Sequence, residues 1–335
     1  MNLPDSASHT MFTPRSKILR THLNRFKAAV NHAAKGDVRA VHRTRVASRR
    51  LRELLPILQL EPDRVRKLGR RLRKVTKRLG VVRELDVLLM LIDELHVCHR
   101  EHSLALGRMA VAVSKERDAA RERLSHRMPV DKMRRIARKL ARIVDGLHES
   151  EASTAHTSAA DAWRWAVDAQ AAVRASRLSL AMTQAGSVYL PERLHAVRIA
   201  LKKLRYSVEL VTVAAGRKAV AELRTLKRAQ DALGRLHDLQ VLIENLRQVQ
   251  ASLAPPSVAV WRALDILMIA LENECRQLHA RYMRQRARLQ SIASSLGSHP
   301  ASLHPRSSPA PTRRDGRARD AVAAERRSAR RPVAV

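Results

Sequence analysis

The sequence predicts an all-α protein, and three observations predict it. Alanine, leucine and arginine, which all favour the helical conformation, dominate the chain. Glycine and proline are sparse until its end, and no run of alternating β-branched residues indicates a strand. The apolar fraction of 45 % is too high for a chain that is intrinsically disordered as a whole.

Helical segments follow one another with short breaks. Gly36 and Asp37 form a turn and an N-cap, and Pro191 suits the first turn of a helix. Residues 254–257 read Ala-Pro-Pro-Ser and separate two helices. The predicted helices span 15–34, 38–59, 63–79, 84–127 (long enough to contain a break), 131–149, 158–183, 191–213, 217–233, 236–252 and 257–294.

Both ends of the chain differ from its middle. Residues 295–335 hold five prolines, nine arginines and three acidic residues without apolar periodicity, which is typical of a disordered basic tail. Residues 1–14 are also expected to be unstructured. Between these ends, the sequence predicts one helical bundle in 15–150 and a second in 156–293.

The chain carries a large excess of positive charge. Its 65 lysines and arginines outnumber 31 acidic residues, which gives a formal net charge of +34. Because this excess repels itself in a compact fold, we expect a polyanionic partner: nucleic acid, an anionic membrane surface or a free polyanion.

The two cysteines, Cys98 and Cys275, exclude a disulfide framework. The longest apolar runs hold six residues, so neither membrane insertion nor a signal peptide is expected, and a cytoplasmic location is.

The chain contains an internal repeat. Residues 41–52 read VHRTRVASRRLR and residues 194–205 read LHAVRIALKKLR, at an offset of 153. A second pair of blocks, 79–88 and 233–242, follows at an offset of 154. Two similar halves predict two similar antiparallel helical bundles related by a pseudo-twofold axis.

Helical spacing gives each first block one basic face and one apolar face. At 100° per residue, the basic residues of each block share one stripe and the apolar residues lie opposite. The basic stripes are His42, Arg45, Arg49 and Arg52 in the first half, and His195, Arg198, Lys202 and Arg205 in the second. The apolar stripes are Ala47, Leu51, Leu54 and Leu58, and Ala200, Leu204 and Val211. Ordinary solvated faces mix charge signs, whereas both of these are single-signed.

The predicted helix that follows the first block is more basic still. Nine of the fifteen residues 64–78 are lysine or arginine, and none is acidic. Val65, Leu68, Leu72, Val75 and Leu79 form its core seam. In the second half Lys227 takes the place of Arg73, but Asp231 takes that of Lys77.

These residue types suit phosphate. The planar guanidinium matches phosphate oxygens, lysine adds a point charge, and histidine donates hydrogen bonds. A spacing of i, i+3, i+7 and i+10 lays the donors in a row about 15 Å long, which is a track for an extended anion. The chain has no GxxxxGK or GxGxxG motif, which single phosphate sites often use.

The residues give little support for catalysis, a metal or a cofactor. No HExxH, GxSxG or kinase signature occurs. Glu272 and Glu274 are two residues apart on a predicted helix and so point apart. In a continuous helix His96 and His99 would share a face that neither Cys98 nor His102 would join.

Nucleic-acid binding is the alternative. Aromatic residues make up only 2 % of the chain, so no distributed surface for stacking single-stranded bases is expected. Trp163 and Trp165 are predicted to anchor helix packing. Sequence-independent duplex binding through charge alone, as in nucleoid-type proteins, stays open, with the basic tail as a candidate contact for DNA.

The paired blocks resemble the CHAD domain family over residues 15–293. The motifs that carry this resemblance are HxxRxxxRRLR at 42–52, HxxRxxxKKLRY at 195–206, and the blocks around Arg83-Glu84-Leu85-Asp86 and His237-Asp238. The resemblance implies two four-helix bundles around a basic central channel. It also implies binding of inorganic polyphosphate and association with polyphosphate granules.

Carried over by position, the resemblance implies a ligand set on both repeats. The implied residues are His42, Arg45, Arg49, Arg50, Arg52, His195, Arg198, Lys202, Lys203 and Arg205, with Arg73, Lys77 and Lys227 added from the neighbouring helices. Many family members carry a triphosphate-tunnel catalytic domain, for which this sequence has no motif. The expected role is therefore binding without hydrolysis, and a polyphosphate- or nucleotide-processing enzyme is the least favoured alternative.

Overall fold

The computed structural model describes residues 13–33, 37–127, 130–153, 156–216, 218–252 and 258–298. Within these ranges all regular structure is helical, which confirms the predicted all-α class. The described helices belong to one compact unit. Residues 295–297, which the sequence predicts to be part of the tail, are helical, because the last helix continues through Gly297. Residues 299–335 and 1–12 lie outside the described ranges. None of the described helices combines the length and apolar character needed to cross a membrane.

Most predicted elements lie where the sequence placed them. Asp37 caps the second helix by accepting a hydrogen bond from the amide of Arg39 at 2.8 Å, and Pro191 begins the eighth. The helices are α1 (Arg15–Ala33), α2 (Val38–Leu54), α3 (Pro62–Arg78), α4 (Gly80–Cys98), α5 (Ser103–Arg127), α6 (Val130–Ser153), α7 (His156–Ala185), α8 (Pro191–Ala215), α9 (Val220–Ala251) and α10 (Val258–Gly297). Two short 3₁₀ turns, Leu55–Ile57 and Arg100–His102, follow α2 and α4.

The predicted break between residues 233 and 236 is wrong. Helix α9 runs unbroken through Gly234, because one glycine inside a helix costs only about 1 kcal/mol. The equivalent point of the first half does break: Leu79 ends α3 and Gly80 begins α4. The first half is therefore interrupted between α3 and α4 where the second half has one continuous helix.

Gly234 provides a test of this continuity. An added Cβ would meet no atom within 4 Å, so we expect Gly234→Ala to raise the free energy of unfolding by about 0.5–1 kcal/mol. Chemical denaturation measures the change. The matched control, Gly186→Ala, should be destabilising, because Gly186 has a φ of +66° after the end of α7. A destabilised Gly234→Ala variant would contradict a continuous α9.

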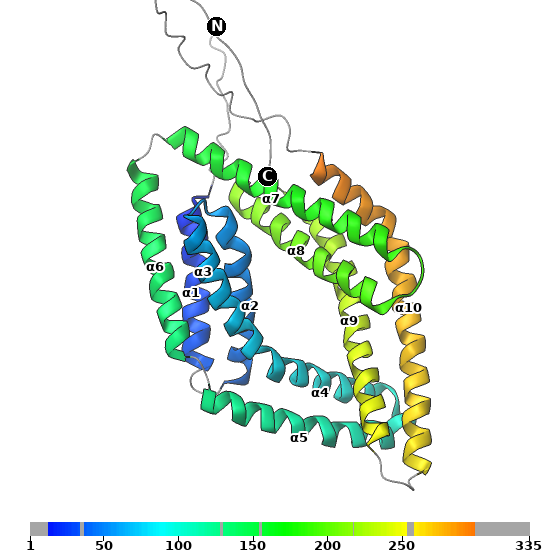
Figure 1. The fold of residues 1–335 in the computed structure, drawn as a ribbon. Coiled ribbons are helices and arrows are strands. Elements are labelled where there is room, and N and C mark those ends of the chain that lie inside the picture. The colour runs from blue at the N-terminus through cyan, green and yellow to red at the C-terminus, as the bar shows by residue number, and fades with distance from the viewer. Residues whose placement is uncertain are drawn as a thin grey trace, which may run out of the picture. The chain divides into compact units, whose positions relative to one another are not determined.

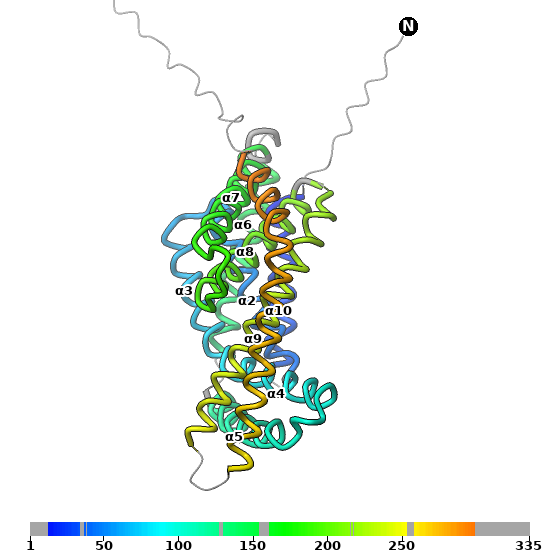
Figure 2. The backbone as a smooth tube through the Cα atoms, turned by 90° about the vertical axis from the view of Figure 1, so that its right-hand side faces the viewer, coloured from blue at the N-terminus to red at the C-terminus, as the bar shows by residue number. Residues whose placement is uncertain are grey.

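Two hydrophobic cores hold the unit together. In one, α1 packs against α2 and α6, and α2 packs against α3 (Figure 1). In the other, α7 packs against α8 and α10, and α9 against α8, α10 and α4 (Figures 1 and 2). Helices α4 and α5, from the first half of the sequence, belong to this second core. Both halves therefore build it, and the pseudo-twofold relation of two four-helix bundles stays a prediction.

The amphipathic faces of α2, α3 and α8 lie as predicted. The residues Ala47, Leu51, Leu54, Leu58, Leu68, Leu72, Val75, Leu79, Leu204 and Val211 are all buried, and Val65 and Ala200 are partly buried. Because the apolar faces point into the cores, the basic faces of α2 and α8 are left for contacts outside the cores. The two helices are tied together by an ion pair between Arg50 and Glu209 at 3.2 Å, and the Arg50 guanidinium lies 5.0 Å from the Tyr206 ring centre.

Candidate functional site

Basic side chains from both repeats meet where α2 lies beside α8. Electrostatic interactions link Lys202 to Arg45, Arg49 and Arg198, and they link Arg198 to Arg45 and Arg49. Helices α4 and α9 add further side chains to the group. We call it the α2–α8 cluster; it consists of His42, Arg45, Arg49, Arg83, His195, Arg198, Lys202, His237 and Asp238.

Sequence reasoning left Arg83, His237 and Asp238 out of the site. Arg83 and His237 occupy equivalent positions of the second repeat block, and each lies near the histidine of its own first block. The Nδ1 atoms of His195 and His237 are 3.3 Å apart, and Arg83 interacts electrostatically with His42. The second repeat block was thus the signal that could have found them.

The carboxylates in this region do not balance the cations. Arg45 pairs with Glu84 at 3.3 Å, but the Glu84 side chain is 67 % exposed. Burial raises the pKa of Asp238, and Arg198 and Arg235 oppose that shift. Arg49 and Lys202 form no ion pair with any described residue. The cluster therefore keeps an excess of positive charge in a half-buried setting.

The pKa of Lys202 shows the effect of burial and of this excess of positive charge. Burial lowers its pKa to about 7, and the charges of Arg49, Arg198 and Arg45 add to the shift. An ammonium group surrounded by cations is destabilised in the absence of an anion. A bound anion next to Lys202 would stabilise the charged ammonium group again.

Two arginines also present buried donors without acceptors. The Nε atoms of Arg45 and Arg49 are buried and have no hydrogen-bond partner among the described residues. Buried polar groups in native proteins normally have partners. The described residues therefore leave these two N–H groups of the cluster unsatisfied.

The histidines are held neutral in the free protein. Burial, together with Arg198, His195 and Lys202, lowers the pKa of His237 to about 4. Burial also lowers the pKa values of His42 and His195. Neutral imidazoles can still donate one hydrogen bond each.

This neutrality predicts acid sensitivity. The pKa of His22, on α1, is also lowered to about 4, by burial and then by Arg50 and Arg25. Since unfolded histidines bind protons that the folded ones resist, the free energy of unfolding should fall as the pH drops from about 6.5 to 4. In denaturation at several pH values, His237→Gln should reduce that fall and the exposed control His126→Gln should not. An equal effect of both variants would contradict the assignment.

A second set of predicted residues lies against carboxylates. Arg50 and Arg205 both pair with Glu209, and Arg205 also donates to Gln230 at 2.8 Å. Arg52 pairs with Glu53 at 3.7 Å, and Lys203 interacts with the same acid. These four cations share two carboxylates, and Arg174, 2.8 Å from Glu53, is a fifth, so their charge is compensated in part within the fold.

The remaining predicted residues are not brought to the cluster by any contact among the described residues. Arg73 and Lys77 are exposed on α3. Lys227 is exposed and pairs with Asp231 at 3.0 Å. Helix α3 instead forms a groove of about 430 Å³ with α6, lined by Arg64, Lys67, Arg71, Lys139 and Arg142.

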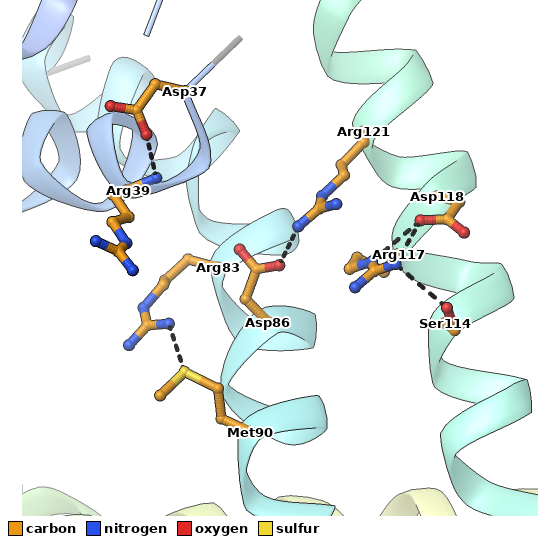
Figure 3. A network of polar contacts seen from close by, with 9 residues as sticks. All are labelled: Asp37, Arg39, Arg83, Asp86, Met90, Ser114, Arg117, Asp118 and Arg121. Carbon is orange, nitrogen blue, oxygen red and sulfur yellow. Dashed lines mark hydrogen bonds and ion pairs between the residues drawn. The ribbon is translucent and has the colours of Figure 1, made fainter. Parts of the chain in front are cut away.

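Arg83 lies at the edge of the cluster. Figure 3 shows its guanidinium beside the Met90 sulfur, at 3.9 Å. The neighbouring Asp86 points to Arg121 across the α4–α5 pair, at 2.8 Å (Figure 3). Arg83 forms no ion pair within the described chain, although it interacts electrostatically with Asp238.

Glu272 and Glu274 pair with different arginines, and Trp163 and Trp165 differ in burial. Glu272 pairs with Arg247 of α9 and Arg276 of α10, and Glu274 pairs with Arg235 of α9. Trp163 is buried in the first core, as a packing residue should be, whereas Trp165 is 45 % exposed.

The expectation that His102 would not join His99 is wrong. It assumed a continuous helix, but α4 ends at Cys98, and His99 adopts φ −134° and ψ 69°. The following 3₁₀ turn brings His102 back to within 6.0 Å of His99, measured between ring centres.

Comparison with known proteins identifies relatives of this fold. The CHAD domain family model matches residues 17–247. PptA from Streptomyces chartreusis matches with a TM-score of 0.58 at 20 % identity, over 81 % of this chain and 97 % of that chain. The crystal structure of the CHAD domain from the plant Ricinus communis matches with a TM-score of 0.52 at 21 % identity, over 86 % and 93 %. At such identities the likeness shows a shared fold. A comparison with the curated proteins finds no match.

Proposed function

Because the chain belongs to the CHAD domain family, we propose that it binds inorganic polyphosphate, without hydrolysing it, at the α2–α8 cluster. Family membership and fold are consistent with a polyphosphate-related function. The observation that carries the specific proposal is the pair of half-buried cations Arg49 and Lys202, which come from the two repeats, interact electrostatically and form no ion pair with any described residue.

The chemistry favours an extended phosphate chain. Arg45, Arg49, Arg198 and Lys202 offer charge-assisted hydrogen bonds, each worth about 1.5–3 kcal/mol. They come from two helices, so successive phosphates of one polymer can contact both. The proposal includes a cytoplasmic location at polyphosphate granules.

The internally paired cations have a different role in this proposal. Arg50 and Arg205 hold α2 and α8 together through Glu209. We therefore expect that the main effect of Arg205→Ala is a lower melting temperature, with little loss of polyphosphate affinity. The main effect of Arg49→Ala should be a loss of polyphosphate affinity, with little change in the melting temperature. Melting curves and binding titrations of the two variants separate the roles, and equal losses of affinity would contradict the division.

A thermal-shift experiment tests the proposed function. A ligand that binds only the folded state at 100 times its dissociation constant stabilises it by about 2.7 kcal/mol. Long-chain polyphosphate should thus raise the melting temperature by about 5 °C or more. An unchanged melting temperature would count against an internal site. Phosphate release during incubation with Mg²⁺ would contradict the absence of hydrolysis.

Sequence-independent nucleic-acid binding is the competing function. It rests on the overall charge and on the basic tail, which lies outside the described residues from 299 onward. Deleting 299–335 should leave polyphosphate affinity nearly unchanged if the α2–α8 cluster is the site. A large loss on deletion would favour the competing function.

A further inference from the structure

A compact set of metal-binding side chains occupies the corner between α4 and α5. The donor atoms of His99, Glu101 and His102 all lie within 4.8 Å of one another. Glu101 Oε1 is 3.2 Å from His99 Nδ1 and 3.7 Å from His102 Nε2. One carboxylate oxygen therefore lies between two imidazole nitrogens.

These separations suit a tetrahedral ion. Zinc bonds of about 2.0–2.2 Å place neighbouring ligand atoms about 3.3–3.5 Å apart. The two distances from Glu101 Oε1 therefore need only small side-chain adjustments. Two imidazoles and one carboxylate are a known zinc ligand set that leaves a coordination position for water.

Packing holds the ligands in place. The 3₁₀ turn that carries Glu101 and His102 contacts α4, α5 and α10. The His102 side chain is only 10 % exposed, whereas Glu101 is 63 % exposed. His99 and His102 line a hollow of about 410 Å³ against α10, so an ion can reach them from solvent.

The other histidine pair lacks a third donor. His195 and His237 approach closely, but no group of three ligand atoms forms around them within the described residues. We propose that His99, Glu101 and His102 bind one Zn²⁺ ion, which fixes the turn between α4 and α5. The proposal is independent of polyphosphate binding.

Metal titration of the full-length protein tests the site. Protein freed of metal with a chelator, and free of polyphosphate, is titrated with Zn²⁺ against a chromogenic competitor, and with Co²⁺ to record its visible absorption. We expect one ion per chain, tetrahedral Co²⁺ bands and a higher melting temperature with Zn²⁺. Glu101→Gln and His102→Ala should weaken Zn²⁺ binding by about 100-fold or more, because even second-shell changes cost 10–100-fold.

Three control variants test whether these three residues, and no others nearby, bind the ion. His96→Ala and Cys98→Ala alter the same corner, and His237→Ala alters the other histidine pair; all three should retain wild-type affinity for Zn²⁺. Glu101 is exposed, so Glu101→Gln should fold normally even if His102→Ala does not. The proposal is overturned if the wild type binds no Zn²⁺, if Glu101→Gln binds as tightly as the wild type, or if His237→Ala removes the ion.

Discussion

Replacing both Arg49 and Lys202 with glutamate should abolish polyphosphate binding. Loss of two charge-assisted hydrogen bonds removes about 3–6 kcal/mol, which is at least about 100-fold in affinity, and the introduced carboxylates add repulsion. The variant should still fold, because each glutamate would face Arg45 and Arg198 in a cluster that lacks negative charge. Isothermal titration with polyphosphate of defined length, at fixed salt, measures the loss.

The groove between α3 and α6 supplies a matched control. Arg71→Glu with Lys139→Glu changes the net charge by the same amount, at cations that also form no ion pair within the described chain. We expect only a modest loss of affinity, from the weaker overall field. Equal losses in the two double variants would show that net charge, and not the α2–α8 cluster, determines binding.

Polyphosphate affinity should fall as the pH rises above 7. The free protein holds the pKa of Lys202 at about 7, and a bound polyanion should restore it toward the ordinary value of about 10.4. Binding between these values takes up a proton, so the dissociation constant should rise by roughly tenfold per pH unit above pH 8. Titrations in two buffers of different ionisation enthalpy measure the proton directly.

Lys202→Arg is the matched control for this dependence. Arginine keeps its charge across the whole range, so the variant should bind with nearly constant affinity from pH 7 to 9. Persistence of the full dependence in Lys202→Arg would assign the proton to another group. Retained affinity at pH 9 in the wild type would show that Lys202 does not contact the ligand.

The sequence was sufficient for the helices and their buried faces, because both follow from local periodicity. Leu51, Leu72 and Leu204 are fully buried as the helical spacing predicts. The sequence did not determine whether the helices of the two halves break at equivalent positions of the repeat. Leu79-Gly80 interrupts the first half and Leu233-Gly234 does not interrupt the second, although the residue pair is the same. Such breaks depend on tertiary packing, as does the placement of α4 and α5 in the second core.

The site was predictable in part for the same reason. Residues at i, i+3 and i+7 on α2 and α8 share a face, so Arg45, Arg49, Arg198 and Lys202 come together. Which cations have carboxylate partners is not visible in a single helix. Glu209 neutralises Arg50 from the other repeat, and Glu53 lies between Arg52 and Arg174. Arg52 and Glu53 are neighbours, but the partners in the Arg50–Glu209 and Arg174–Glu53 pairs are far apart in the sequence.

A competition measurement tests the central claim most directly. The protein is loaded with labelled long-chain polyphosphate and titrated with duplex DNA, RNA and heparin, at matched phosphate or sulfate concentration and one salt concentration, because affinities of polyanions depend on salt. If the α2–α8 cluster is a site shaped for polyphosphate, the label stays bound in a large excess of every competitor. If DNA, RNA and heparin displace it as readily as unlabelled polyphosphate does, the cluster is a general cationic surface and the proposed function is wrong.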